Sequence, residues 1–365
     1  MLNTRHASAA AAAAALLLTL SNLPSPVGAT SKADYISNAV NATDVLNQQF
    51  YNESSGLWSN LWWQSGNLLT AVADLGLVDD DFKDTSADIC KKVSVTAKEF
   101  NGGNWLNDFY DDEGWWALAL IRCYDLTQSG GYLLDAQAIF EDQLTGNDAT
   151  CGGHWWSKDK TANTAIGNAL YLAIGASLAS RGATRDGTSY QQYAEEEFTW
   201  WYSSALMASN NTFQDGLELS TCKPKPDSPV FTYNQGVILG AMVELNKATS
   251  NQTYLDYASK VAHGAIDHLT DSNGILTEVG YPGPPDVTAA MFKGVFARNL
   301  GYLQTAAGDD AYVTFLQNNA DTIWKKDRQD DGQLGPDWQG PMFTPNAASQ
   351  GSALDCLVAA AAATS

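Results

Sequence analysis

The stretch Phe109-Tyr110-Asp111-Asp112-Glu113-Gly114-Trp115-Trp116 sets two adjacent carboxylates directly before two tryptophans. The apolar run 117–121 follows it, which is typical of a buried helix. Asp111 and Asp112 then lie in the first helical turn, where unpaired backbone N–H groups and the helix dipole favour negative charge. Capping of the helix is one explanation for the pair.

The two tryptophans favour a second explanation, in which the acids belong to a sugar-binding cleft. Aromatic rings pack against the C–H faces of a sugar, while polar groups bind its hydroxyls. Glycoside hydrolysis also needs two carboxyl groups, one to protonate the leaving oxygen and one to attack or to activate water. The stretch therefore predicts that Asp111 and Asp112 are catalytic.

Helical periodicity recurs about every 25–30 residues, and strand-like alternation is scarce. The pattern predicts twelve helices, at residues 31–50, 62–78, 85–100, 111–127, 132–144, 161–180, 188–208, 233–249, 254–269, 287–307, 310–326 and 347–363.

Twelve helices in one domain, spanning 30–365, favour an all-α fold: an (α/α)6 barrel of six helical hairpins with inner and outer helix rings. The even-numbered helices are rich in Ala, Gly and Leu and carry few charges, as in 236–241, so we expect them to form the buried inner ring. The seventh, ninth and eleventh helices carry a charged face and are expected outside. An open helical-repeat solenoid is the competing architecture, but it usually shows stronger self-similarity.

Polar and aromatic clusters fall before or at the start of the even-numbered helices, at 61–64, 111–112, 151–156, 231–236, 282–286 and 336–340. If those helices are inner, the clusters meet at one mouth, where helix N-termini help to bind hydroxyls. Candidate substrate-binding residues there are Gln64, Trp115, Trp116, Gly153, Trp155, Trp156, Asp215, Tyr233, Asn234, Gln235, Lys293 and Trp338.

Some of these residues have a structural alternative. Asp215 precedes a glycine and could simply form a turn. Neighbouring helical residues point about 100° apart, so at most one tryptophan of each pair can stack on a given sugar while the other packs. We expect Glu113 to support the helix dipole. Of Lys293 and Arg298, we expect one to pair with a carboxylate near the site and the other with a structural acid.

The chain resembles glycoside hydrolase family 76, the endo-α-1,6-mannanases, and most of all the secreted fungal members. The resemblance covers nearly all of the chain after residue 29. It rests on Tyr110–Trp116, Cys151-Gly152-Gly153 with Trp155-Trp156, Thr232–Gly236, Phe292-Lys293-Gly294 with Arg298, and Gln350–Asp355.

The resemblance implies retaining endo-hydrolysis of an α-1,6-mannan backbone, with Asp111 as nucleophile and Asp112 as general acid/base. Asp111, nearer the positive helix end, should stay ionised, whereas Asp112 needs a pKa raised by burial beside a tryptophan. Many relatives have a third glycine where this chain has His154, which leaves the shape of the sugar subsites open. The family also includes wall-anchored proteins associated with mannan transglycosylation.

Residues 1–29 read as a secretory signal, with Arg5, an apolar run at 9–20 and a small-residue cleavage site at 27–29. We therefore expect a secreted, extracellular protein with no membrane span or lipid anchor, and a monomer. The sequons predict N-glycosylation at Asn41, Asn52, Asn210 and Asn251.

The charge and the cysteines narrow the chemistry further. A formal net charge of −21 disfavours nucleic acid and anionic membranes as partners, and is compatible with a neutral polysaccharide. Of five cysteines, Cys151 and Cys222 lie in loops at the expected mouth, and an oxidising compartment favours a disulfide between them. The histidines and cysteines show no metal-ligand spacing, so we expect no metal and no cofactor.

Three other functions remain compatible with the same scaffold. One is a mannan transglycosylase, and another is a non-catalytic mannan-binding or wall-organising protein. The third is an (α/α)6 polysaccharide lyase, which would need a Tyr/His or Arg constellation near an acidic substrate. The negative charge of the chain disfavours the lyase.

Overall fold

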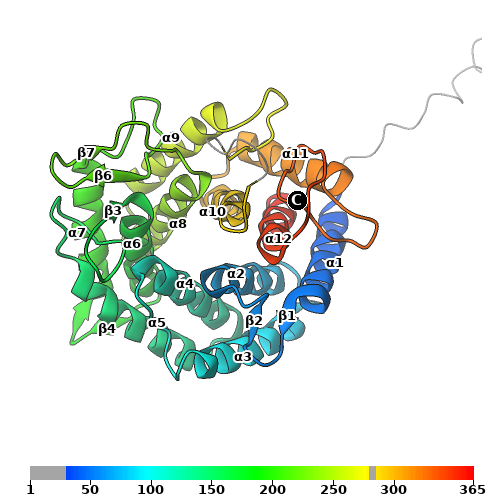
Figure 1. Ribbon diagram of the computed structural model, residues 1–365, viewed down its shortest axis with the longest axis horizontal. Coiled ribbons are helices and arrows are strands. Elements are labelled where there is room, and N and C mark those ends of the chain that lie inside the picture. Colours follow the sequence, from blue (N-terminus) through cyan, green and yellow to red (C-terminus); the bar gives the residue numbers. More distant parts are fainter. Residues whose placement is uncertain (1–29, 279–284) are drawn as a thin grey trace, which may run out of the picture. The chain divides into compact units, whose positions relative to one another are not determined.

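Helices in the described part of the chain alternate between an inner and an outer ring (Figure 1). The computed structural model describes residues 30–278 and 285–365, so the expected signal and part of the 282–286 cluster lie outside it. The inner helices are α2 (Trp62–Val78), α4 (Tyr110–Thr127), α6 (Ala165–Ser180), α8 (Thr232–Thr249), α10 (Phe292–Ala307) and α12 (Ala347–Ala363). The outer helices are α1 (Lys32–Phe50), α3 (Lys83–Phe100), α5 (Gly130–Gln143), α7 (Tyr190–Ser203), α9 (Thr253–His268) and α11 (Asp310–Lys326).

The inner ring is closed. Each inner helix packs against the next one along the chain, and α12 packs back against α2. The outer helix α1 lies against α12, so the first and last helices of the fold are neighbours (Figure 1). The (α/α)6 barrel expected from the sequence is therefore confirmed, and an open solenoid is excluded.

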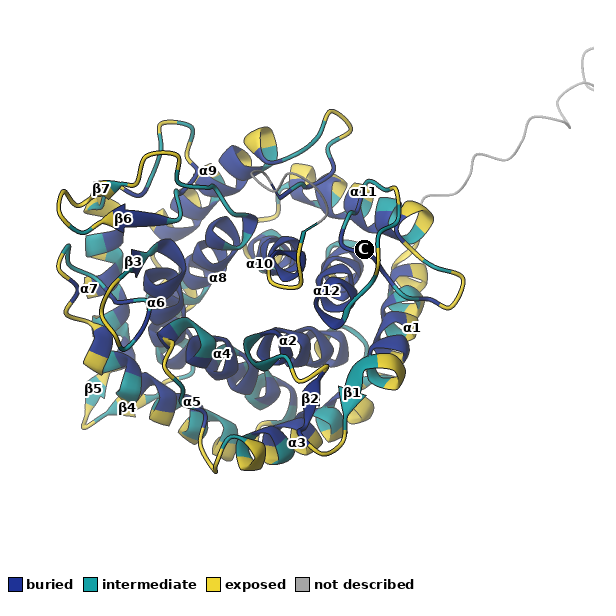
Figure 2. Cartoon of the chain, in the orientation of Figure 1, coloured by how far each residue is buried: buried dark blue, intermediate teal, exposed yellow. Residues whose placement is uncertain are grey.

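Burial separates the two rings as the composition predicts. In α12 the residues from Ala347 to Ala361 are all buried, and α6 is almost as completely enclosed. The outer helices keep one exposed face (Figure 2). Glycines let the inner helices approach closely: a Cβ on Gly236 of α8 would lie 2.6 Å from the Cα of Phe296 in α10.

Short strands occupy the connections between helices. They are β1 (Tyr51–Asn52), β2 (Leu57–Trp58), β3 (Asn163–Thr164), β4 (Thr184–Arg185), β5 (Thr188–Ser189), β6 (Gly216–Glu218) and β7 (Lys223–Pro224). β1 pairs with β2 and β4 with β5, while β3, β6 and β7 form one antiparallel sheet.

Three predicted helices are shorter in the structure by four residues or more. α6 starts at Ala165 and not at 161, because β3 pairs with β6 immediately before it. α7 ends at Ser203 and not at 208. α10 starts at Phe292 and not at 287, because the 3₁₀ turn η2 (Ala289–Met291) precedes it. A second 3₁₀ turn, η1 (Leu144–Gly146), follows α5.

A buried ion pair links three inner helices. Nη1 of Arg298 in α10 lies 3.0 Å from an oxygen of Asp355 in α12, and its Nη2 donates to Oδ1 of Asn67 in α2 at 2.7 Å. Arg298 therefore has the structural acid that we expected for one of the two cations. None of the helices in the described ranges combines the length and apolar character needed to cross a bilayer.

Candidate active site

The acid pair lies at the N-terminal end of α4. Because inner and outer helices alternate in direction, all inner helices begin at this end of the barrel. Phe109 precedes α4 in an extended conformation and provides no side-chain cap. The backbone N–H of Tyr110 donates instead to the carbonyl of Trp156, at 3.0 Å. Asp111 and Asp112 occupy the first turn, as the sequence predicts.

Each carboxylate of the pair accepts one hydrogen bond from a loop side chain. Nε1 of Trp156 donates to Oδ2 of Asp111 at 2.8 Å. Nδ2 of Asn107 donates to Oδ2 of Asp112 at 2.7 Å. Both aspartates are half-buried, so they keep an open side toward the mouth of the barrel.

Burial raises the pKa of both Asp111 and Asp112, and the charge of Asp112 raises the pKa of Asp111 further. The hydrogen bonds from Trp156 and Asn107 act in the opposite direction. Desolvation acts against our expectation that the helix start keeps Asp111 ionised. Interacting carboxyl groups lose their protons in two separate steps. Between these steps the pair carries one proton, which suits one nucleophile and one acid.

Glu113 lies in the first turn of α4, as expected of an acid that supports the helix dipole, and it is also a core residue. Its side chain is 0% exposed. Its Oε1 lies 2.8 Å from Nζ of Lys158 and accepts the backbone N–H of Asn107 at 2.8 Å. Burial raises the pKa of Glu113 to about 8, and the contacts with Lys158 and Asn107 oppose the rise.

Three aromatic rings at this end of the barrel are half-buried: Trp63, Tyr233 and Trp156. The ring of Tyr233 stacks on Phe292 with centroids 3.9 Å apart, and Trp63 lies 6.3 Å from the same phenylalanine. Phe109 and Trp156 form a second aromatic contact, at 4.9 Å. Tyr233 and Trp156 were candidate residues from the sequence. Trp63 was not, although its place beside Gln64 at a helix start was a usable signal.

Several other candidates lie in the core and not on the cleft surface. Trp115 is 2% and Trp116 0% exposed. Trp115 packs between Trp63 and Tyr233, whereas Trp116 packs against Trp62. Both members of this pair are thus packing residues, so our expectation that they divide between platform and core does not hold.

The second tryptophan pair does divide. Trp155 is 5% exposed, and its Nε1 donates to Asp148 at 2.9 Å. Trp156 is half-buried and reaches the acid pair.

Lys293 and Trp338 are also buried, at 1% and 0% exposure. Nζ of Lys293 donates to the carbonyl of Pro336 at 3.0 Å and lies 4.7 Å from the centre of the Trp338 ring. Burial lowers the pKa of Lys293 to about 8. These two residues therefore hold the connection between α11 and α12 against α10. Sequence spacing could not show this, because the loop that covers Lys293 is more than 40 residues away in the chain.

Two amide side chains at the start of α8 hold the loop that carries Asp215. Asp215 is half-buried and accepts a hydrogen bond from Nδ2 of Asn234 at 3.0 Å. Burial raises the pKa of Asp215. Gln235 is fully buried, and its amide exchanges hydrogen bonds with the backbone N–H and C=O of Phe213. Gln235 thus fixes the loop that carries Asp215.

The candidate residue Gln64 is buried, since its side chain is 5% exposed.

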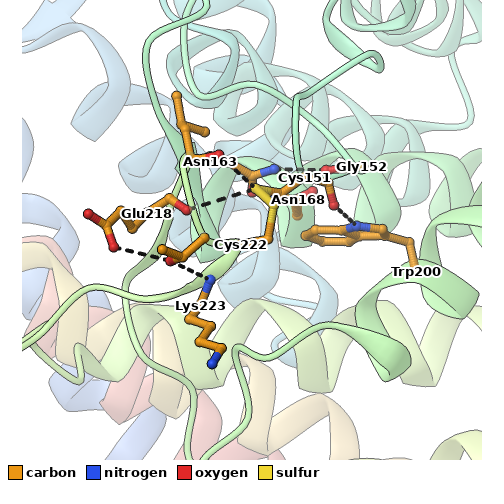
Figure 3. The surroundings of a disulfide bond; sticks show 10 residues. Cys151, Gly152, Asn163, Asn168, Trp200, Glu218, Cys222 and Lys223 are labelled. Carbon is orange, nitrogen blue, oxygen red and sulfur yellow. Dashed lines mark hydrogen bonds between the residues drawn. A yellow bond between two sulfur atoms is a disulfide. The ribbon is translucent and has the colours of Figure 1, made fainter.

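The predicted disulfide holds the loop that carries Trp156. Cys151 is bonded to Cys222, which ties this loop to the β6–β7 hairpin (Figure 3). Nε1 of Trp200 donates to the carbonyl of Cys151 at 2.9 Å. Gly153, at φ +70°, lies so near the Trp200 ring that a Cβ would stand 2.8 Å from it. Gly153 is therefore needed for the shape of the loop.

A second disulfide joins Cys90 to Cys123, and Cys356 is free and buried.

His154 does not reach the cleft. Its ring is fully buried, stacks on Tyr171 and contacts the edge of Tyr110. Burial lowers its pKa to about 4. The departure from the third glycine of many relatives therefore changes packing behind the site.

Asn107 and Lys158 are site-supporting residues that the sequence reasoning missed. Asn107 is an asparagine just before a helix, a position where this residue often forms turns, and that was the available signal. Lys158 carried none. In the described ranges, no group of three or more His, Cys, Asp and Glu side chains is placed to hold a metal ion.

A cavity of about 600 Å³ lies away from the pair, toward the C-terminal ends of the inner helices. Four of its charged lining residues pair with one another, Arg298 with Asp355 and Arg122 with Asp74. The candidate active site is therefore assigned to the opposite end of the barrel, where the acid pair lies.

A family profile and several known proteins are similar to the chain. The profile described as Glycosyl hydrolase family 76 matches residues 30–364. Mannan endo-1,6-alpha-mannosidase DFG5 of Saccharomyces cerevisiae is 26% identical over 267 residues, which are 67% of this chain and 57% of that protein. The chain thus spans less than two thirds of this relative.

Solved structures share the fold. The Lin0763 protein from Listeria innocua has a TM-score of 0.79 and 25% identity, over 90% of this chain and 97% of that one. An inactive variant of the α-1,6-mannanase GH76A of Salegentibacter sp., with two adjacent aspartates changed to asparagine, was solved with α-1,6-mannotriose. It has a TM-score of 0.77 and 22% identity, over 90% and 99% of the two chains.

Proposed function

Because the chain belongs to glycosyl hydrolase family 76, we propose that it is an endo-acting glycosidase that cleaves α-1,6-mannosidic bonds in a mannan backbone. The names of its relatives support this substrate: the yeast protein is a mannan endo-1,6-alpha-mannosidase, and the Salegentibacter enzyme was solved with α-1,6-mannotriose. The acidic chain suits a neutral polysaccharide.

One observation carries the proposal: two adjacent, half-buried carboxylates stand at the start of α4, and each accepts a hydrogen bond from one loop side chain. We propose that Asp111 attacks the anomeric carbon while Asp112 protonates the departing oxygen. Asp112 then removes a proton from a water molecule, which attacks the anomeric carbon of the mannosyl–enzyme and releases the sugar from Asp111. A retaining pair lies roughly 5–5.5 Å apart and an inverting pair roughly 6.5–9.5 Å. Neighbouring residues on one helical turn suit the shorter distance. The order of the two roles follows the family.

The surroundings of the pair suit a hexose. The exposed parts of Trp63, Tyr233 and Trp156 offer apolar faces to the C–H groups of the sugar rings. Asp215, held by Asn234, offers an acceptor to the hydroxyls. We propose these as the substrate-binding groups of the cleft.

Substitution of the pair tests the mechanism. Asp111→Asn should abolish turnover of linear α-1,6-manno-oligosaccharides while the circular dichroism spectrum stays unchanged. Asp112→Ala should keep some activity on substrates with good leaving groups, which need less acid assistance. Proton NMR should show the α-anomer as the first product. If the β-anomer forms first, the enzyme inverts and Asp111 is not a nucleophile.

The product profile separates hydrolysis from the other functions. Hydrolysis yields only oligosaccharides shorter than the substrate, whereas products longer than the substrate would indicate transglycosylation. Binding without turnover by the wild-type protein would indicate a mannan-binding protein.

We further propose that the protein is secreted and N-glycosylated. Asn41 and Asn251 are exposed, and Asn52 and Asn210 are half-buried. N-terminal sequencing of the protein from culture medium should begin near residue 30. Digestion with an N-glycosidase should reduce its mass.

A further inference from the structure

Glu113 stands directly behind the acid pair in a fully buried position. Its Oε1 is held by Nζ of Lys158 and the N–H of Asn107, each at 2.8 Å. Its Oε2 has no hydrogen-bond partner among the described residues. A buried carboxylate that loses its cation is strongly destabilised, so the contact with Lys158 favours the ionised form of Glu113.

Asn107 joins Glu113 to Asp112. Its backbone N–H is fixed by Glu113, and its Oδ1 accepts the N–H of Phe109 at 2.8 Å. Because Oδ1 is occupied in this way, Nδ2 must point to the other side, where it donates to Oδ2 of Asp112 at 2.7 Å. The amide of Asn107 therefore has one orientation, and it presents a donor to Asp112.

Lys158 also joins the segments that carry both donors of the pair. Its backbone N–H donates to the carbonyl of Asp108 at 2.9 Å, next to Asn107. Its Nζ lies 2.9 Å from Asp142 of α5. Two residues before it in the chain, Trp156 donates to Asp111. One lysine thus connects the donor of Asp111 with the donor of Asp112.

We propose that Lys158, Glu113 and Asn107 form a positioning relay for the acid pair, although neither Lys158 nor Glu113 contacts it. The relay holds the Asn107 amide on Asp112 and thereby sets the protonation equilibrium of the general acid. The inference rests on the proposed function for its kinetic consequence, but the hydrogen-bond chain itself can be tested without turnover.

The direction of the effect follows from the charges. The donor from Asn107 stabilises the carboxylate of Asp112, so its loss raises the pKa of that group. The nearest other charges are Asp111 on the pair, and Lys158 and Asp142 around Glu113. Because the acid must be protonated for bond cleavage, the alkaline limb of kcat/KM moves to higher pH when the relay is broken. A hydrogen bond to a charged group corresponds to a shift of about one pH unit.

Four variants and one control test the relay. Lys158→Met and Asn107→Ala should each shift the alkaline limb upward by about one unit and lower kcat about tenfold with little change in KM. The double variant should shift the limb no further, because both changes break one chain. Lys158→Arg, which keeps the positive charge beside Glu113, should keep the wild-type pH profile of kcat/KM. Lys160→Met is the control: this lysine is on the same loop but pairs with exposed Asp148, so the limb should not move.

Carbon NMR of the Asp112 carboxyl group separates this inference from the proposed function. A higher titration midpoint in Asn107→Ala and Lys158→Met supports the relay even if the wild-type protein does not cleave mannan. Asn107→Ala keeps the Glu113–Lys158 pair, so it remains informative if Lys158→Met does not fold. An active wild-type enzyme with the same Asp112 midpoint in Asn107→Ala would overturn the relay.

Discussion

At the scale of single residues, the acid pair is defined by the hydrogen bonds that each carboxylate accepts. Both aspartates have a raised pKa because they are buried, and each has one side-chain donor that opposes the rise. The donor of Asp111 is the indole N–H of Trp156, whose ring also packs on Phe109. Trp156 is thus an electrostatic partner of the proposed nucleophile as well as an aromatic surface.

Trp156→Phe tests this electrostatic role. The change keeps an aromatic ring and removes the N–H, so the pKa of Asp111 should rise. Because the nucleophile must be ionised, the acidic limb of kcat/KM should move upward by about one pH unit. Trp105→Phe is a matched control, since that indole donates to Asp135 of α5 and not to an aspartate of the pair. An acidic limb that stays in place in Trp156→Phe would contradict the assignment.

At the scale of secondary-structure elements, ion pairs join the far ends of neighbouring inner helices. Arg181, at the end of α6, lies 2.9 Å from Glu244 of α8, and Lys247 lies 2.8 Å from the same carboxylate. Burial alone would raise the pKa of Glu244, but these two cations outweigh it and lower the pKa to about 2. The contact therefore stabilises the fold whenever Glu244 is ionised.

Glu244→Gln should lower the free energy of unfolding by roughly 3 kcal/mol at pH 7. A depressed folded-state pKa stabilises the protein above the unfolded value of 4.5, and this stabilisation is lost as the pH falls toward 2. The difference between wild type and variant in urea unfolding should therefore be clearly smaller at pH 3. Glu141→Gln, which breaks an exposed pair with Arg185, should show a smaller effect. A pH-independent difference for Glu244→Gln would argue against the ion pair as its cause.

At the scale of the whole molecule, two disulfides cross-link the barrel with different consequences. Cys90–Cys123 joins α3 to α4 with a sequence separation of 33 residues. Cys151–Cys222 joins the Trp156 loop to the β6–β7 hairpin with a separation of 71 residues. Both disulfides lower the conformational entropy of the unfolded chain, but only Cys151–Cys222 holds a part of the proposed cleft.

Replacing either cysteine pair with alanine should lower stability by roughly 3–4 kcal/mol. At temperatures well below melting, only Cys151→Ala/Cys222→Ala should also reduce kcat/KM, because the Trp156 loop loses its tether. Melting temperature and kcat/KM measured side by side decide the matter. Equal losses of activity in the two double variants would show that the loop does not depend on its own disulfide.

The sequence by itself determined the periodic and the local features. Helices α2, α11 and α12 have the predicted bounds, because helical periodicity depends on neighbours three or four positions away. The acid pair lies in the first turn of α4, and the Cys151–Cys222 bond is present, since loops before inner helices share one end of a closed barrel.

Only the tertiary structure decided which side chains face the cleft. Trp115 and Trp156 each belong to a Trp-Trp pair, yet Trp115 packs between rings of α2 and α8 while Trp156 reaches Asp111. Lys293 is buried under a loop from between α11 and α12. Burial, and with it the pKa of a carboxyl group or an ammonium, depends on segments distant in the chain that cover the residue. No pattern of adjacent residues contains that information.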